Sequence, residues 1–175
     1  MKPKVIYTVG HSTRAADAFV ALLLAHGVTS LADVRTVPRS RHNPQFNSDS
    51  LAASLAAHGI GYVRFPGLGG FRRASPDSRN AGWRNASFRG YADYMQTPAF
   101  AEHLGLLLEL ARNEIVAVMC AEAVPWRCHR SLIADALLAR GMRTEEIVSE
   151  MKTTVHELTP FARIEGTQVT YPALA

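Results

Sequence analysis

The sequence predicts one α/β domain over residues 1–175, with three layers in which helices cover both faces of a mostly parallel sheet of about five strands. Two observations predict this fold class. Short apolar segments alternate with segments of helical periodicity along the chain, and glycine follows several of the helical segments where helices commonly end. Strands that alternate with helices of about 10–15 residues are typical of βαβ crossovers, which produce a covered parallel sheet.

The expected strands are short runs of apolar and β-branched residues, bounded by Gly, Pro or polar residues. The first ends at Gly10, and the fourth, with the sequence EIVAVM, has the strongest strand character. A hairpin is also expected around Glu165 and Gly166, where turn residues separate two extended segments. The expected strands cover residues 5–9, 30–34, 62–65, 114–119 and 145–151.

The expected helices are segments in which apolar residues recur at a spacing of three to four positions. Pro98 is expected to begin a new helix, because proline fits the first turn. Residues 66–89 are rich in Gly, Arg, Ser and Asn, and we expect a long mobile loop that serves as a lid or binding loop. The expected helices cover residues 15–27, 48–58, 91 onward, 98–112 and 128–140.

The composition is that of an ordinary globular domain, with 47% hydrophobic and 19% charged residues. No apolar run approaches the ~20 residues that span a bilayer, and the first residues lack the pattern of a signal peptide. We therefore expect a cytoplasmic protein with no membrane partner. Its two cysteines are expected to be reduced thiols rather than a structural disulfide. The composition favours no particular oligomeric state.

Positive charge is concentrated in one third of the chain. Residues 35–89 contain nine arginines, no lysine and only two acids, Asp49 and Asp77, so this segment carries +7 in a chain whose net charge is +4. Arginine binds phosphate and carboxylate groups with a planar fork of donors. The segment therefore indicates an anion-binding surface, the alternative being solvated loops in an arginine-rich composition.

Polar residues follow the expected strands directly, and in open α/β sheets ligands bind outside the carboxyl ends of the strands. The connections at the opposite edge are plain helix ends. This convergence is the main sequence argument for a functional site. The residues concerned are Gly10, His11 and Ser12 after the first strand, Asp33, Arg35, Ser40 and Arg41 after the second, Gly69 and Gly70 after the third, and Cys120, Glu122, Cys128, His129 and Arg130 after the fourth.

Several short motifs resemble one known family. They are TVGHS (8–12), DVR (33–35) with P-x-S-R (38–41), LGG (68–70), FRGYADYM (88–95) and CAE…CHR (120–130). With these motifs the chain resembles the family called domain of unknown function 488, from near the N-terminus to about residue 165. The resemblance implies the α/β fold and the position of the site, and it implies no particular reaction.

Both cysteines lie in the segment CAEAVPWRCHR, residues 120–130. Cys128 is at the expected N-terminus of a helix, where unpaired N–H groups and neighbouring Arg127, His129 and Arg130 would stabilise a thiolate. Cys128 is therefore the candidate nucleophile or redox-active thiol, against the alternative of a structural cysteine. Cys120 ends a buried strand and is either a second, less reactive thiol or a small core residue.

Three further residues are candidates for acid–base roles. His11 and His129 have the side chain suited to general acid or base catalysis, the alternative for His11 being a hydrogen bond to the loop backbone. Glu122 is either a catalytic acid or the partner of Arg35 or Arg130 in a buried ion pair.

The candidate substrate-binding residues share hydrogen-bonding groups or permissive backbone near the same edge. Asp33 and Arg35 alternate along a strand and could pair, while Asp33 could instead cap the loop that follows. The glycines allow a close approach of phosphate to the backbone. Phe71 with Arg72 and Arg73, and later Trp83 with Arg84, alternate aromatic and arginine residues, a combination that suits nucleic acid. The set comprises Ser12, Asp33, Arg35, Ser40, Arg41, Gly69, Gly70, Tyr91, with its hydroxyl facing the cleft, and Arg130.

These residues support an enzyme with a Cys/His/Arg site for an anionic, phosphate-bearing substrate such as a nucleotide or nucleic acid. The expected enzyme is a thiol- or His-dependent hydrolase or transferase that uses no cofactor. The first alternative is a non-catalytic module that binds single-stranded nucleic acid. The second is a zinc-binding protein that uses Cys120, Cys128 and His129, although the spacing lacks paired C-x2-C knuckles. The loop is also analogous to phosphatase and rhodanese loops, but six residues rather than five separate Cys120 from Arg127.

Overall fold

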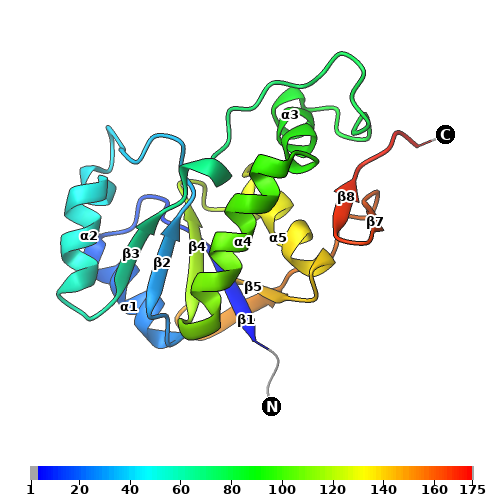
Figure 1. Cartoon of the computed structure of the whole chain (residues 1–175). Helices are drawn as coiled ribbons and strands as arrows, with labels where there is room; N and C mark the ends of the chain where they lie inside the picture. Colours follow the sequence, from blue (N-terminus) through cyan, green and yellow to red (C-terminus); the bar gives the residue numbers. More distant parts are fainter. Residues whose placement is uncertain (1–3, 175) are drawn as a thin grey trace.

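The computed structural model describes residues 4–174 and confirms the predicted fold class (Figure 1). A six-stranded sheet has the order β3-β2-β4-β1-β5-β6, in which the first five strands are parallel and β6 is antiparallel to β5. A separate hairpin of β7 and β8 confirms the turn expected around Glu165 and Gly166. The strands are β1 Val5–Gly10, β2 Ser30–Asp33, β3 Gly61–Arg64, β4 Val116–Cys120, β5 Arg143–Ser149, β6 Lys152–Val155, β7 Arg163–Glu165 and β8 Gln168–Thr170.

The helices occur where the periodicity predicts them, with shifted ends. The helix expected from residue 91 begins earlier, because the side chain of Asn85 accepts hydrogen bonds from the backbone of Ser87 and Phe88 and so caps it. The helix expected from Cys128 begins two residues later, after a short 3-10 turn over Pro125–Arg127. The helices are α1 Ala16–Ala25, α2 Ser48–Ala56, α3 Ala86–Met95, α4 Pro98–Asn113 and α5 Arg130–Ala139.

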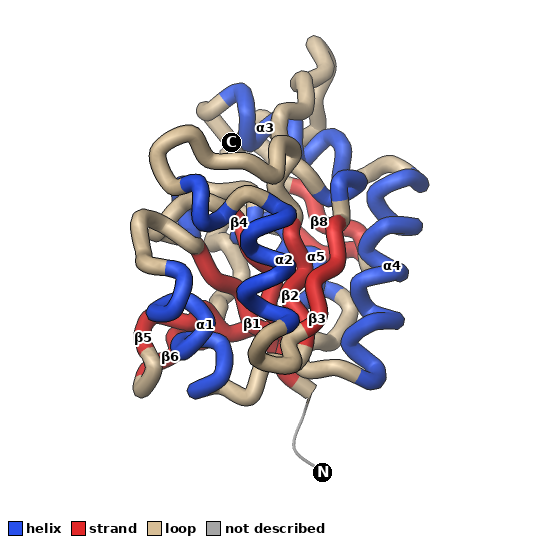
Figure 2. Tube along the Cα trace, turned by 90° about the vertical axis from the view of Figure 1, so that its left-hand side faces the viewer, coloured by secondary structure: helices blue, strands red, loops and turns tan. Residues whose placement is uncertain are grey.

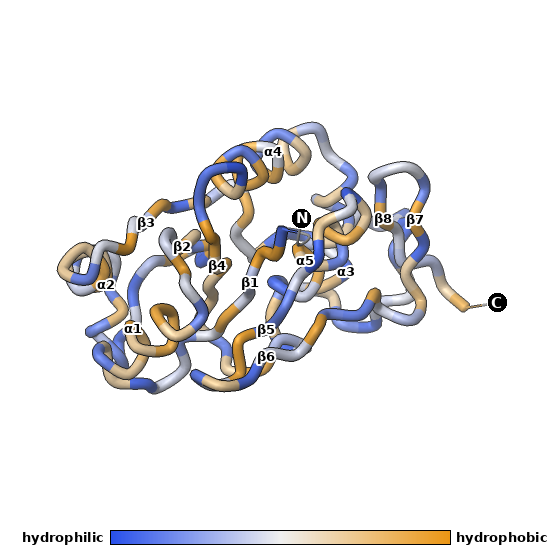
Figure 3. Tube along the Cα trace, turned by 90° about the horizontal axis from the view of Figure 1, so that it is seen from below, coloured by the Kyte–Doolittle hydropathy of each residue, from blue (hydrophilic) through white to orange (hydrophobic). Residues whose placement is uncertain are grey.

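Alternate residues of β4 face two separate cores. Ala117 and Met119 belong to the cluster beneath α1 and α2, whereas Val118 and Cys120 belong to the cluster beneath α3, α4 and α5. In Figure 3, α1 and α4 accordingly lie on opposite sides of the strands. Cys120 therefore points towards α5, the helix that follows its own strand.

The chain changes face between two neighbouring strands. β2 leads to α2 on one face and β4 leads to α5 on the other, while β2 and β4 pair directly from Ser30 with Val116 to Asp33 with Met119. The divergence opens a crevice at their carboxyl ends, where ligands bind in folds of this type. The loops that follow the strands gather at this edge (Figure 2).

The arginine-rich loop is irregular from Gly69 to Asn85, after a 3-10 turn over Pro66–Leu68. Asn80 is fully buried and donates to Asp93 and Gln96 at 2.7 Å each, while its amide oxygen accepts from the backbone of Tyr171 at 2.9 Å. These contacts anchor the middle of the loop to α3 and to the C-terminal hairpin. Movement of the loop as a lid stays a prediction, and Asn80 confines any such movement to the parts on either side of it.

Candidate functional site

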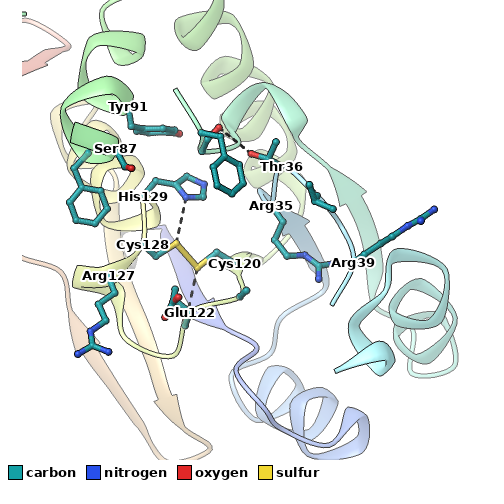
Figure 4. A pocket seen from close by; sticks show the side chains of 15 residues that line it. Arg35, Thr36, Arg39, Ser87, Tyr91, Cys120, Glu122, Arg127, Cys128 and His129 are labelled. Atoms are coloured by element: carbon teal, nitrogen blue, oxygen red, sulfur yellow. Dashed lines mark hydrogen bonds between the residues drawn. A yellow bond between two sulfur atoms is a disulfide. The ribbon is translucent and has the colours of Figure 1, made fainter. Parts of the chain in front are cut away.

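A cavity of about 450 Å³ opens at the carboxyl ends of β2 and β4 (Figure 4). Three guanidinium groups and one carboxylate line it, together with both cysteines and an apolar wall. Four connections contribute, namely the segments after β2, β3 and β4 and the first turn of α3. The lining residues are Arg35, Thr36, Val37, Arg39, Gly70, Phe71, Ser87, Phe88, Tyr91, Cys120, Ala121, Glu122, Arg127, Cys128 and His129.

Gly10 is required where the strand ends meet. A Cβ at this position would lie 1.6 Å from the carbonyl oxygen of Glu122, so only glycine lets the two loops approach. The backbone N–H groups of His11 and Ser12 donate to the carbonyls of Cys120 and Ala121 at 2.9 and 3.0 Å. The glycine of the TVGHS motif therefore sets the path of the cysteine-bearing loop.

The two cysteines lie together. The sulfur atoms of Cys120 and Cys128 are in direct contact (Figure 4), so the two side chains can form a disulfide, and the expectation of two reduced thiols stays a prediction. The sequence separates them by eight positions, but the 3-10 turn after β4 brings Cys128 back over the end of the strand. Both side chains are almost fully buried and both line the cavity.

His129 is oriented towards Cys128. Its Nε2 lies 3.2 Å from the carbonyl of Val34, which can only accept, so Nε2 carries the proton and Nδ1 presents a lone pair to the Cys128 sulfur 3.5 Å away. Burial lowers the pKa of His129 to about 4, with Arg130 contributing in the same direction. His129 is therefore neutral at pH 7 and able to accept a proton from a Cys128 thiol.

Arg130 is fully buried and its donors are occupied. Its guanidinium binds both carboxylate oxygens of Glu146, at 3.2 and 2.6 Å, and the carbonyls of Glu122 and Ala123 at 2.6 and 3.1 Å. Its Nη1 also donates to the Cys120 sulfur at 2.6 Å. The prediction that Arg130 binds substrate is therefore wrong for this geometry, since it holds the cysteine loop and supplies positive charge to Cys120.

His11 is buried behind the cavity wall and is not among the lining residues. Its Nδ1 donates to the carbonyl of Ser12 at 2.8 Å, and its Nε2 faces Nη1 of Arg35 at 3.4 Å. Its ring stacks on Phe46, with 4.3 Å between the centroids. Burial lowers the pKa of His11, and Arg35 contributes to this direction. The hydrogen bond to the loop backbone, foreseen as the alternative to acid–base catalysis, is the role this geometry supports.

Asp33 and Arg35 pair with each other. Nε and Nη2 of Arg35 donate to the two carboxylate oxygens of Asp33 at 2.9 and 2.8 Å. The backbone N–H of Arg35 adds a third donor at 3.0 Å, so Asp33 also caps the loop, and the Tyr62 hydroxyl adds a fourth. Asp33 is fully buried, so it faces no ligand, whereas Arg35 reaches the cavity wall. The pair fixes the orientation of Arg35 and neutralises part of its charge.

Glu122 lies exposed at the cavity mouth, and its carboxylate pairs with neither Arg35 nor Arg130. The predicted ion pair is therefore wrong, because Arg130 binds the Glu122 carbonyl instead. A catalytic role for the free carboxylate stays a proposal. Ser12 has a left-handed backbone, with φ of 52°, and it does not cap α1, which begins after Ala15.

The segment after β2 contributes a different arginine from the one expected. Ser40 accepts from the backbone of Asn43 at 3.0 Å and so closes a tight turn, and Arg41 is exposed outside the cavity. Arg39 lines the cavity instead. Arg39 and Arg41 stand two positions apart, so in an extended segment either could face the site. The turn around Ser40 decides that Arg39 does.

The segment after β3 forms the wall of the cavity beside His129. Gly70 lines the cavity, and a Cβ there would lie 3.3 Å from Nδ1 of His129, whereas Gly69 packs behind it against Thr36. The hydroxyl of Tyr91 donates to the carbonyl of Leu68 at 2.8 Å, so the prediction that it faces the cleft is wrong. The ring of Tyr91 lines the cavity and lies 5.0 Å from the His129 ring.

Phe71 lines the cavity, as its place in the alternation of aromatic and arginine residues predicts. Arg127 lines it as well, although the sequence indicated for it only a role in stabilising the Cys128 thiolate. Phe71 is 88% exposed and has a left-handed backbone, with φ of 58°, an unusual combination for a large apolar residue. Trp83, by contrast, packs among Phe88, Phe161 and Tyr171 and is unavailable for stacking on a ligand. The position of Phe71 directly after Gly69 and Gly70 was the sequence signal for its place in the site. The exposure of its side chain depends on the fold and could not be predicted from that position.

Within residues 4–174, no group of three or more His, Cys, Asp and Glu side chains is arranged as ligands for a metal ion. Of the residues of the zinc alternative, Cys120 is in contact with Cys128 and with Nη1 of Arg130, and Nε2 of His129 faces the carbonyl of Val34. No helix in the described part of the chain combines the length and apolar character needed to cross a bilayer.

Neither the curated proteins nor the solved structures that were compared with the chain include a match. A family model does match, over residues 15–137, which include both cysteines, the Asp33–Arg35 pair and most of the cavity wall. The TVGHS motif precedes the matched range. The match covers well over half of the chain, and the protein therefore belongs to the family described as Domain of unknown function DUF488.

Proposed function

We propose that this protein is a thiol-dependent enzyme that acts on an anionic, phosphate-bearing substrate such as a nucleotide. One observation carries the proposal: the Cys128 sulfur lies 3.5 Å from a histidine nitrogen whose lone pair is aimed at it, inside a cavity lined by three arginines. A nucleophile, a base and a third group that orients the base form the usual arrangement of covalent catalysis. Here the orienting group is the carbonyl of Val34.

The anion would bind against the guanidinium groups at the cavity rim. Arg39 and Arg127 are both exposed, and no ion pair found within residues 4–174 involves either of them. Phe71 and Phe88 supply an apolar wall on which a planar ring could stack. A phosphate with an attached ring can contact both the guanidinium groups and the aromatic wall, whereas a bare phosphate can contact only the guanidinium groups.

In the reduced protein, Nδ1 of His129 would take the Cys128 proton as the sulfur attacks the electrophilic centre. The bond to the leaving group breaks, and its oxygen receives the proton held on His129. Water or a second hydroxyl acceptor then attacks the covalent intermediate and releases the thiolate, while His129 takes the proton of the attacking hydroxyl and passes it to the Cys128 sulfur. Atoms and charge balance without a cofactor, and the overall reaction is hydrolysis or group transfer.

The test is alkylation of the reduced protein followed by peptide mapping, with Cys128 and Cys120 quantified separately. We expect Cys128 to react at pH 7 faster than a free cysteine peptide, and adenosine monophosphate to slow that reaction. Addition of a chelator should change neither result, whereas release of slow cysteines by the chelator would support the zinc alternative. Equal and slow reaction of both cysteines in every condition would overturn the proposal.

A non-catalytic nucleic-acid-binding module is the second candidate, and the exposed side chain of Phe71 beside exposed Arg73 favours it. Aromatic stacking and phosphate contacts of this kind bind single strands without reading sequence. Affinity for an oligonucleotide should then fall steeply with salt and persist in Cys128→Ser. Affinity that does not respond to salt would remove this candidate.

A further inference from the structure

Two sulfur atoms in contact inside one cavity can exchange electrons as well as transfer a group. We propose that Cys120 and Cys128 form a catalytic dithiol that reduces small anionic disulfides, with Cys128 as the attacking thiol and Cys120 as the resolving thiol. This inference rests on the nucleophilic Cys128 of the proposed function and adds a second thiol and a substrate class to the same site.

The loop geometry keeps the sulfur atoms close whether or not they are bonded. Arg130 holds the carbonyls of Glu122 and Ala123, and its own position is fixed by both carboxylate oxygens of Glu146. The first turn of α5 holds the other end, since the Arg130 N–H lies 3.5 Å from the Cys128 sulfur. Reduction therefore leaves a resolving thiol in place, which exchange requires.

The surroundings of the two sulfur atoms differ in the way that an attacking and a resolving thiol require. Cys128 has a neutral base beside it, at 3.5 Å. Cys120 has a fixed guanidinium donor at 2.6 Å, which stabilises a thiolate and makes its sulfur a ready second nucleophile.

The chemistry balances in two exchange steps. The Cys128 thiolate attacks one sulfur of a disulfide R–S–S–R, forms a mixed disulfide and releases one thiolate, RS⁻. The Cys120 thiolate attacks the Cys128 sulfur, closes the intramolecular disulfide and releases the second RS⁻. The protein loses two electrons and two protons, and the substrate gains both as two thiols. Two molecules of a further thiol, such as glutathione, restore the dithiol by the reverse steps and leave joined as their own disulfide.

The preferred substrate is anionic because Arg39 and Arg127 stand at the rim of the cavity with Arg35 in its wall. Glu122 is the one acidic residue among the lining residues. A disulfide whose arms carry carboxylates or phosphates is attracted by this set, and one with amino groups is repelled.

The experiment mixes reduced protein with glutathione disulfide, which carries more carboxylates than amino groups, and quenches samples with acid for intact mass analysis. We expect the wild-type chain to reach the intramolecular disulfide and release two glutathione molecules. Cys120→Ser should stop at one glutathionyl group on Cys128, and Cys128→Ser should react at least tenfold more slowly. Cystamine, the cationic probe, should react several-fold more slowly than glutathione disulfide with the wild type.

Accumulation of the glutathionylated wild-type chain without ring closure would overturn the resolving role of Cys120. Equal rates with the anionic and cationic probes would overturn the assigned substrate class. If neither probe reacts while Cys128 alkylates rapidly, exchange fails and the proposed function survives. If alkylation is slow as well, both fail together, so the two proposals are distinguished by one pair of measurements.

Discussion

Arg127 and Arg130 lie three positions apart in one loop and have opposite environments. Arg130 is fully buried and binds a carboxylate, two carbonyls and a sulfur, whereas Arg127 is exposed at the rim of the cavity. Arg130 holds the site together, and Arg127 is available to a ligand. A motif rich in arginine therefore contains both structural and recognition residues, and burial is what separates them.

The largest expected effect is on stability at Arg130. Arg130→Met leaves the Glu146 carboxylate buried without its partner, so we expect a loss of about 3–5 kcal/mol in the free energy of unfolding. Arg127→Met should change it by less than about 0.5 kcal/mol. Urea unfolding of the two variants checks the contrast. Arg130→Met combined with Glu146→Leu should recover part of the loss in the free energy of unfolding. Equal effects of Arg130→Met and Arg127→Met would contradict the comparison.

The second effect concerns His129 and pH. Its pKa of about 4 in the folded protein lies below the ordinary value of 6.5, so the unfolded chain binds more protons between these values. The contribution of His129 to stability is therefore complete above pH 6.5 and is lost as pH falls towards 4, by roughly 2–3 kcal/mol.

Unfolding measured at pH 7 and at pH 4.5 checks this, with His129→Gln as the comparison. The glutamine amide can still donate to Val34 but does not titrate, so the decrease in stability should be smaller in the variant. All other titratable groups are the same in both proteins, which makes the difference between them specific to His129. An identical decrease would contradict the lowered pKa.

The third effect is on anion selectivity. Iodoacetate is anionic and iodoacetamide is neutral, so the ratio of their rates at Cys128 reports the positive charge at the rim. We expect Arg39→Met and Arg127→Met each to lower this ratio by roughly fivefold, about 1 kcal/mol in activation free energy. Arg112→Met is the matched control, because Arg112 is an exposed arginine of α4 remote from the cavity. An equal change in the control would contradict a local role.

The smallest effect is at Phe71, whose left-handed backbone is unfavourable for a phenylalanine. Phe71→Asn should raise stability by up to about 1 kcal/mol, while protection of Cys128 by adenosine monophosphate should decrease. Ser12→Asn is the control for the backbone effect alone, since Ser12 also has positive φ but does not line the cavity. Unchanged protection in Phe71→Asn would contradict a stacking role.

The fold class and the edge of the sheet that carries the site were predictable from local patterns. A fully buried strand such as Val116–Cys120 is a continuous apolar run, and a helix such as Ala16–Ala25 has a periodic apolar face, so each is recognisable without its neighbours. The antiparallel β6 was not predicted, because four residues that are mostly exposed carry no periodic signal.

The candidate residues were predictable as a group and not in their individual roles. Cys128 and His129 are adjacent in sequence, but the orientation of His129 depends on the carbonyl of Val34, which is 95 positions away. Arg130 is buried because Glu146 comes from β5, which pairs with β1. No local pattern encodes these partners.

Sequence alone determined the alternation of strands and helices, the loop that carries both cysteines, and the concentration of arginine, since each depends on neighbouring residues and their periodicity. Tertiary structure decided which arginines are free, which nitrogen of His129 faces the sulfur, and that Cys120 and Cys128 meet. The physical reason is that charge neutralisation and burial need a partner from a distant strand, whereas the sulfur contact needs the 3-10 turn that returns Cys128 over the end of β4. Packing of the sheet, rather than spacing along the chain, supplies that partner.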